Sequence, residues 1–181
     1  GCYLEGWEGF EWRWKTEHFR AIRREWSCPQ WIGESDKNAS ILVHAEQGFG
    51  DTIQFSRYFN QVAERIGRVL VECPLPLKGL IANCPGIDEV IVTGRSLPNV
   101  DFHIPMMSLP GVFKTEIETI PREFPYMFVT ENLRKKWADR IEGKGLLKVG
   151  LVWKGSHKHQ RNAWRSPGLI ALEPLFDIDG I

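Results

Sequence analysis

Residues 40–58 have the sequence Ser40-Ile-Leu-Val-His-Ala-Glu-Gln-Gly-Phe-Gly-Asp-Thr-Ile-Gln-Phe-Ser-Arg-Tyr58. The run Ile41–Val43 is apolar and rich in β-branched residues, which predicts a buried strand of a parallel sheet. A glycine-rich turn follows at 47–51, and the apolar residues after it are spaced as on one face of a helix. We therefore expect a strand, a tight loop and a helix, with the loop at the strand's carboxyl end. Open α/β sheets bind their ligands at that edge.

The loop contains two glycines and a carboxylate, at Gly48, Gly50 and Asp51. Glycines at these positions allow the backbone to approach a ligand or another element closely. Asp51 is a candidate general base or hydroxyl acceptor, because an anion site at a helix start would not place a carboxylate beside its N–H groups. The loop is not a dinucleotide fingerprint, since Ile53 stands where the third glycine would fall. The alternative is an ordinary turn in which Asp51 only caps the helix.

Further strands are predicted along the chain by short apolar runs between turn residues, at 68–73, 89–92, 101–104 and 148–153. Gly67 is expected to end the helix after the loop. Further helices are expected at 77–83, 131–141 and 167–176. Because strands and helices alternate, the fold class is α/β, with a Rossmann-like, doubly wound parallel sheet. The first three strands are expected in one sheet, with Ile41–Val43 central.

Residues 1–26 predict a helix with an aromatic face, formed by Tyr3, Trp7, Phe10 and Trp14 at near-helical spacing. The pattern Gly1-x-Tyr3-x-x-Gly6-x-x-x-Phe10 resembles the second helix of a tetratricopeptide repeat. A half-repeat cannot bury its apolar face alone. The Trp7/Phe10/Trp14 face is therefore expected to pack on the following domain, on preceding repeats or on a partner. A plain amphipathic helix is the alternative. Residues 27–39 are rich in turn formers and predict a linker.

The composition argues against several classes of protein. Lys+Arg and Asp+Glu both number 23, so the formal charge is zero, which disfavours nucleic-acid binding through bulk positive charge. No apolar run approaches the ~18 residues of a membrane span, and no signal peptide is visible. The four cysteines form no C-x-x-C pair, so we expect free thiols and a cytoplasmic location.

No metal site is expected. His157 and His159 are two residues apart without a nearby carboxylate, which is a poor ligand set. His44 follows an apolar run and is expected to be a packed core histidine rather than a catalyst.

Several blocks together carry a family resemblance: Ala45–Tyr58, Val149-Gly-Leu-Val-Trp-Lys-Gly155, Arg165-Ser166 and Gly6-Trp7-Glu8-Gly9-Phe10-Glu11-Trp12-Arg13. The set resembles bacterial tetratricopeptide-repeat (TPR) proteins with a glycosyltransferase domain similar to the ADP-heptose lipopolysaccharide heptosyltransferases of glycosyltransferase family 9. The resemblance covers nearly the whole chain. It implies a GT-B fold, in which two Rossmann-like domains face each other across a cleft. The first domain handles the acceptor, and the second binds most of the sugar nucleotide.

On this resemblance we expect a TPR-like helix and linker at 1–38, an acceptor-side Rossmann-like domain at 39–147 and the start of a truncated donor-side domain at 148–181. The family's candidate base carries over onto Asp51. Donor contacts carry over loosely onto Lys154, Arg165 and Ser166, and Lys154 departs from the small residue more often found there. No cofactor is implied. The partners would be a nucleotide sugar and a glycan or protein acceptor.

The chemistry of glycosyl transfer fits these residue types. It needs a base near the acceptor hydroxyl, and cations or N–H groups near the leaving diphosphate. Asp51 can be the base, while Gly48, Gly50 and Arg57 can contribute to substrate binding with the basic loop 154–166. That loop has an alternative as a solvated linker. Because most of the donor site would be missing, the chain alone is expected to be inactive. Two other functions stay open: an interaction module associated with TPR repeats, and a sugar or nucleotide binder without transfer chemistry.

Overall fold

The computed structural model describes residues 1–141, 147–156 and 161–178. The chain divides into two compact units, Gly1–Thr130 and Glu131–Ile181. This division groups residues by their packing. The domain boundaries predicted at 38 and 147 concern the organisation of a longer protein, and they stay a prediction.

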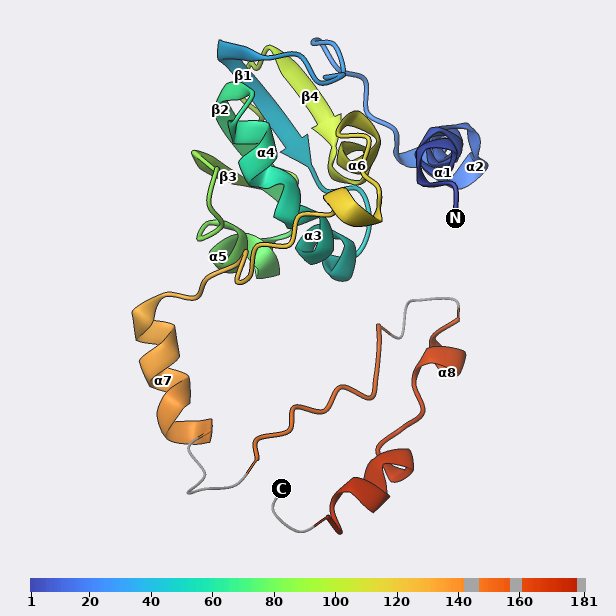
Figure 1. Cartoon of the computed structure of the whole chain (residues 1–181), viewed down its shortest axis with the longest axis vertical. Helices are drawn as coiled ribbons and strands as arrows, with labels where there is room; N and C mark the ends of the chain where they lie inside the picture. Colours follow the sequence, from blue (N-terminus) through green and yellow to red (C-terminus); the bar gives the residue numbers. More distant parts are fainter. Residues whose placement is uncertain (142–146, 157–160, 179–181) are drawn as a thin grey trace. The chain divides into compact units, whose positions relative to one another are not determined.

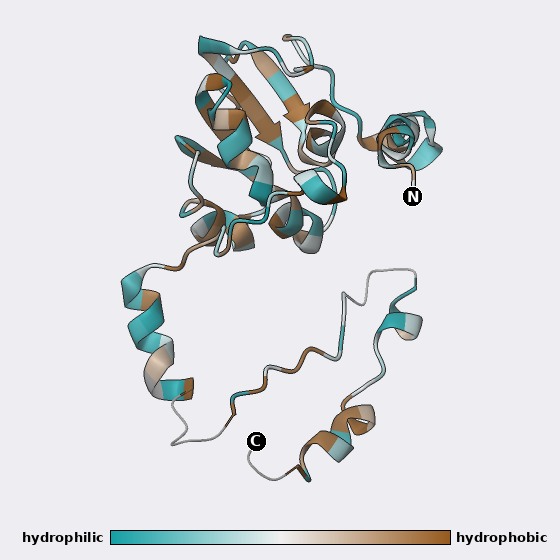
Figure 2. Cartoon of the chain, in the orientation of Figure 1, coloured by the Kyte–Doolittle hydropathy of each residue, from teal (hydrophilic) through white to brown (hydrophobic). Residues whose placement is uncertain are grey.

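One parallel sheet organises the first unit (Figure 1). It consists of β1 (Asp36–His44), β2 (Ile66–Cys73), β3 (Glu89–Val92) and β4 (Phe102–Pro105), in the order β3-β2-β1-β4. The predicted α/β class and Rossmann-like parallel sheet are confirmed. The apolar run Ile41–Val43 lies in an inner strand and is fully buried. Figure 2 shows strongly hydrophobic segments in β1 and β4, with hydrophilic residues at the start of β1 and within β4.

Short helices accompany the strands of this unit: α1 (Tyr3–Phe10), η1 (Glu11–Lys15), α2 (Glu17–Ile22), α3 (Phe49–Phe55), η2 (Ser56–Tyr58), α4 (Phe59–Ala63), η3 (Leu75–Leu77), α5 (Lys78–Ile81), η4 (Met106–Ser108), α6 (Leu109–Val112) and η5 (Ile117–Thr119). The helix predicted after the loop is α3, η2 and α4 in direct succession. Its apolar face is buried as expected, with Phe55, Tyr58, Phe59 and Val62 in the core.

The two faces of the sheet are covered differently. On the first face, Ile41, Val43 and Ile104 join a large core with helix residues such as Phe59 and Leu109. The second face carries a small cluster, Leu42, Leu70 and Ile91. The partly buried residues packed against that cluster are Trp26, Leu97 and Val100, and none of them lies in a helix.

The connection between β3 and β4 explains this difference. The chain must pass from β3 across β2 and β1 to reach β4 on the other side of β1. In a doubly wound sheet such a crossover usually carries a helix that covers the second face. Here residues 93–101 contain no helix. The second face is therefore left to irregular chain.

The N-terminal helix is shorter than predicted. Residues 1–26 form α1, η1 and α2, because Thr16 is extended (ψ 151°) and its hydroxyl donates to the Arg13 carbonyl, 2.7 Å away. Arg23 is also extended, so α2 ends at Ile22. The aromatic face packs on the same unit: the Trp7 indole donates to the Thr115 carbonyl at 2.7 Å, and Phe10 contacts the main core.

The first part of the predicted linker hydrogen-bonds to the sheet. The Trp31 N–H donates to the His103 carbonyl at 2.9 Å, and the His103 N–H donates to the Pro29 carbonyl at 3.1 Å. These bonds occupy β4 on the side away from β1. The fully buried Trp31 anchors the segment in the core beside Phe113.

In the second unit, α7 (Glu131–Ile141) has the predicted bounds. The strand predicted at 148–153 is wrong, because residues 147–156 form no regular secondary structure. A strand needs a hydrogen-bonded neighbour, and the described residues of this unit contain no other strand. The helix predicted at 167–176 is also wrong in extent. The structure has α8 (Asn162–Arg165) and η6 (Ile170–Leu175), separated at Gly168, whose φ of 84° is incompatible with a right-handed helix.

Gly67 does not end a helix, as predicted, but lies within β2. The β1–β2 register is irregular there, since Asp36 pairs with Ile66 and Ser40 with Arg68. Residues 37–39 of β1 therefore lie opposite the single residue Gly67 of β2, and the Lys37 backbone approaches Gly67 closely. A Cβ at Gly67 would lie 2.6 Å from the Lys37 carbonyl carbon and nearer still to its oxygen.

We expect Gly67→Ala to destabilise the protein by about 2 kcal/mol or more, because backbone in an inner strand pair cannot move aside cheaply. Chemical denaturation would measure the loss. Gly79→Ala in α5 is the matched control, since a Cβ there meets nothing within 4 Å and alanine favours helix. Equal stability of the two variants would contradict the close approach at Gly67.

Candidate functional site

The loop after β1 places Asp51 at the start of α3. Gly48 is the residue before the helix, and its N–H donates to Asp51 Oδ2 at 2.9 Å. Gly48 has no side chain to return such a bond, so the cap is one-sided. Asp51 is half-buried. A Cβ at Gly50 would meet nothing within 4 Å, so the fold itself does not require glycine at that position.

Arg57 lies in η2, after α3, and its side chain contacts two other parts of the first unit. Its Nε donates to the Gln54 carbonyl at 2.9 Å. Its guanidinium lies 5.0 Å from the ring centroid of Tyr126. These contacts attach the segment after η5 to the helical face of the unit.

The predicted donor-side residues belong to the second unit. Ser166 accepts a hydrogen bond from the Gly155 N–H at 3.0 Å and donates to Asn162 at 2.8 Å. The residue next to Gly155, Lys154, is exposed, and so is Arg165 in α8. The structure thus brings the backbone beside Lys154 close to Ser166. His157 and His159 lie outside the described residues.

A buried ionic network joins the N-terminal segment to the β1 loop. The Arg13 guanidinium donates to both carboxylate oxygens of Glu46, at 3.0 and 3.1 Å, and to the Ser108 hydroxyl at 2.7 Å. Glu11 accepts from both Arg13 and Ser108, each at 2.7 Å. Arg13 is 7% exposed, and the Glu46 side chain 3%. Burial raises the pKa of Glu46, and the Arg13 guanidinium opposes that effect.

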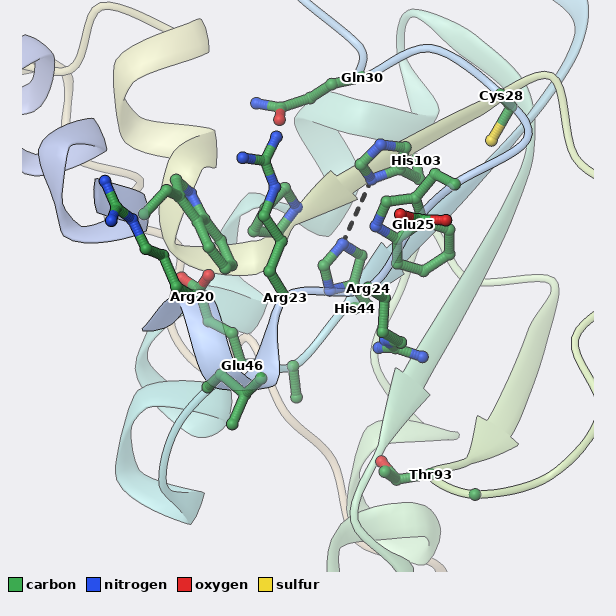
Figure 3. Close-up of a pocket in the computed structure, with 16 residues that line it drawn as sticks. Arg20, Arg23, Arg24, Glu25, Cys28, Gln30, His44, Glu46, Thr93 and His103 are labelled. Atoms are coloured by element: carbon green, nitrogen blue, oxygen red, sulfur yellow. Dashed lines mark hydrogen bonds between the residues drawn. The ribbon is translucent and has the colours of Figure 1, made fainter. Parts of the chain in front are cut away.

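A pocket of about 1180 Å³ opens at the carboxyl edge of the sheet (Figure 3). Its wall combines strand ends with the N-terminal segment, and includes Trp14, Arg20, Arg23, Arg24, Trp26, His44, Ala45, Glu46, Thr93 and His103. The pocket thus lies where the chain order reverses, between β1 and β4, at the expected place for a ligand in an open α/β sheet. Gly48, Gly50 and Asp51 are not among its lining residues.

Two histidines form the floor of this pocket. His44 Nε2 lies 3.4 Å from His103 Nδ1, a distance at which one imidazole donates and the other accepts. The Trp26 ring stacks on both, at centroid distances of 4.7 and 4.3 Å. Burial, reinforced by Arg24, holds the pKa of His44 well below its usual value and lowers the pKa of His103 to about 4. Both imidazoles are therefore neutral at pH 7.

A buried carboxylate lies beside His44 on the same face of the sheet. Glu72 is the β2 partner of His44 and is 1% exposed. Arg24 compensates its charge through a 2.6 Å ion pair. The Arg24 guanidinium also lies 4.8 Å from the ring centroid of Trp26, which links this ion pair to the histidine stack.

The sequence reasoning missed this pocket. It predicted His44 to be a packed core histidine, and the residue is indeed only 4% exposed, but it also lines the floor of the pocket. His103 and Glu72 also lie within apolar strand runs, so three polar residues interrupt runs that should be continuous. That interruption is a signal the sequence contains. The sequence contains no comparable signal for Arg24 and Trp26. Both residues lie at the end of the segment 1–26, which was predicted to be helical.

Among residues 1–141, 147–156 and 161–178, no three His, Cys, Asp or Glu side chains are grouped so as to hold a metal ion. The same residues include no helix long and apolar enough to cross a membrane. The four cysteines are free. In comparisons with known proteins, no family model, no curated protein and no solved structure matches the chain.

We expect Arg13→Ala to cost about 3 kcal/mol or more, because it leaves the Glu46 carboxylate buried without its cation. Denaturant unfolding would measure this loss. Arg68→Ala is the control, since the Arg68–Glu89 pair is about half exposed and should be worth less than about 1 kcal/mol. Glu46→Gln added to Arg13→Ala should recover part of the loss. Equal losses in the two single variants would show that the network contributes no more than a surface pair.

The histidine pair predicts a pH dependence of stability. Between pH 6.5 and about 4 the unfolded imidazole of His103 binds a proton that the folded one does not, so stability falls as pH falls through this window. The loss attributable to His103 should reach about 3 kcal/mol. The free energy of unfolding of the wild type and of His103→Gln would be measured from pH 7 to pH 4. Both proteins contain the same carboxylates, so the difference between the two curves gives the contribution of His103. If the free energies of unfolding of the two proteins changed in parallel with pH, the predicted contribution of His103 would be contradicted.

Proposed function

We propose that the first unit is the acceptor-side domain of a GT-B glycosyltransferase, similar to the family 9 heptosyltransferases, and that it takes part in transfer of a sugar from a nucleotide-diphosphate donor to an acceptor hydroxyl. One observation carries the proposal. The loop Glu46–Asp51 directly follows an inner strand of an all-parallel sheet, at the edge where such sheets bind substrates.

The state of Asp51 supports a role as general base. Only one carboxylate oxygen, Oδ2, caps the helix, and among the described residues none bonds to Oδ1. The side chain is half-buried, so it combines restricted motion with solvent access. The open space at Gly50 leaves room for an acceptor to approach the loop backbone. In this proposal the acceptor hydroxyl loses its proton to Oδ1 as the hydroxyl oxygen forms the new glycosidic bond and the nucleotide diphosphate leaves.

Lys154, Arg165 and Ser166 stay proposed substrate-binding residues on the family resemblance. Arg57 stays one on the chemistry of glycosyl transfer, as a cation for the leaving diphosphate. The preceding repeats, the glycan or protein acceptor and the cytoplasmic location are likewise part of the proposal. The free cysteines support a reducing compartment. The packing of Trp7 on Thr115 supports a TPR-like end helix that docks on the domain after it.

A second candidate function is sugar or nucleotide binding without transfer. The cap bond from the Gly48 N–H to Asp51 favours it, because that bond alone explains a carboxylate at this position. The two functions differ in what the loss of the carboxylate charge does to turnover.

We expect Asp51→Asn to lower turnover by roughly 10²-fold or more, since an amide cannot accept the proton. The assay is sugar transfer from a panel of nucleotide-diphosphate sugars, by a longer protein that contains this chain and a complete donor-side domain. Asn can still cap the helix, so stability should barely change. Asp36→Asn is the matched control, because Asp36 also caps a backbone N–H, that of Asn38 at 2.8 Å, at the opposite end of β1. Full turnover by Asp51→Asn would leave Asp51 as a cap only.

A further inference from the structure

The second face of the sheet is polar where an ordinary core would be apolar. His44, Glu72 and His103 project from three neighbouring strands onto the same face as Leu42 and Leu70. Burying polar side chains on an inner sheet face costs free energy that a purely structural core would avoid. The chain packed against the neighbouring apolar cluster is not helical, and His44 and His103 line the pocket. This end of the face therefore has the character of a binding-site wall.

The charges around the histidine pair are mainly cationic (Figure 3). Arg23 and Arg24 lie on either side of the pair, and Arg20 lies further along the wall. Besides burial, Arg24 and Arg23 lower the pKa of His103. Arg24 and Arg13 lower the pKa of His44. These cations outweigh the neighbouring carboxylates at the two imidazoles.

The carboxylates in the pocket wall and beside it are already neutralised or peripheral. Glu72 is paired with Arg24, and Glu46 is paired with Arg13. Glu25 is exposed. Among the described residues, Arg20 and Arg23 form no ion pair. Two guanidinium groups thus remain available to an anion from outside.

A wall residue also has an unused donor. The indole N–H of Trp14 is buried and has no acceptor among the described residues. A buried donor without an acceptor costs roughly 1–3 kcal/mol.

We propose that this pocket binds a small molecule through a phosphate or carboxylate group, with Arg23 and Arg20 as its cations and the His44–His103 pair as a neutral hydrogen-bonding floor. The volume, about 1180 Å³, exceeds what an oxyanion alone fills, so the ligand carries a larger body beside Trp26. This inference goes beyond the proposed glycosyl transfer and does not depend on it, because no lining residue of the pocket is assigned a part in that reaction.

The test is an NMR titration of the 181-residue chain, with the imidazole C–H signals of His44 and His103 as reporters. Inorganic phosphate and malonate are added in separate arms at constant ionic strength, with chloride as the reference. Bound anion stabilises the imidazolium, so the pKa of His103 should rise from about 4 by roughly 1 or more. We expect dissociation constants on the order of millimolar for these minimal probes. A response to phosphate alone assigns a phosphate-bearing ligand, and a response to malonate alone a carboxylate-bearing one.

Arg23→Gln combined with Arg20→Gln should weaken the anion response about tenfold or more, since two charge-assisted contacts are lost. Both side chains are exposed, so the fold should persist, which circular dichroism checks. Arg68→Gln is the matched control, because Arg68 lies near the amino end of β2, at the opposite edge of the sheet. The inference is overturned if neither anion moves the pKa of His103 beyond the chloride reference, or if Arg68→Gln weakens the response as much as the double variant.

Discussion

The short connection between β3 and β4 is the constraint on which the rest of the first unit depends. Residues 93–101 must carry the chain past the ends of two strands, and no residues remain for a helix over the second face. A parallel sheet exposed on one face would be unstable, so other chain has to cover it. The N-terminal segment does so through Trp26, and the incomplete cover leaves the pocket. The strand order therefore determines where the pocket can be.

The hydrogen-bonded network of Arg13 attaches the N-terminal segment, which covers the second face, to the rest of the unit. Arg13 belongs to η1, Glu46 to the β1 loop and Ser108 to η4, so one guanidinium ties three separate segments together. Ion pairs buried in this way stabilise little by themselves, but they are costly to break and they specify one arrangement. The same residues connect the pocket with the Asp51 loop, since Glu46 lines the first and begins the second. The N-terminal helices and the parallel sheet are in this way combined in one packed unit.

The sequence predicted the sheet well and the pocket poorly, for a physical reason. Strands such as Glu89–Val92 are defined by local apolar runs and turn residues, and their parallel pairing follows from the helices between them. The register irregularity at Gly67 arises from pairing with Lys37, which no local pattern encodes. The strand predicted at 148–153 had the right composition, yet strand formation also requires a neighbouring strand. Of the predicted site residues, Gly48 donates to Asp51, which is the cap that the sequence offered as the alternative to a catalytic role. Contacts such as Arg24 with Glu72 join positions far apart in the chain, and a sequence alone cannot pair them.

The hydrogen bonds between residues 29–31 and β4 have a consequence for self-association. Sheet edges with free N–H and carbonyl groups are templates on which another copy can add a strand, the first step towards fibrils. Here Pro29 and Trp31 already occupy the outward-facing backbone of His103, and β4 ends at Pro105. β3, at the other edge, has only four residues and begins with a charged one, Glu89. Both margins of the sheet are thereby unsuited to recruiting further strands, a safeguard that a parallel sheet this small needs while its four strands assemble.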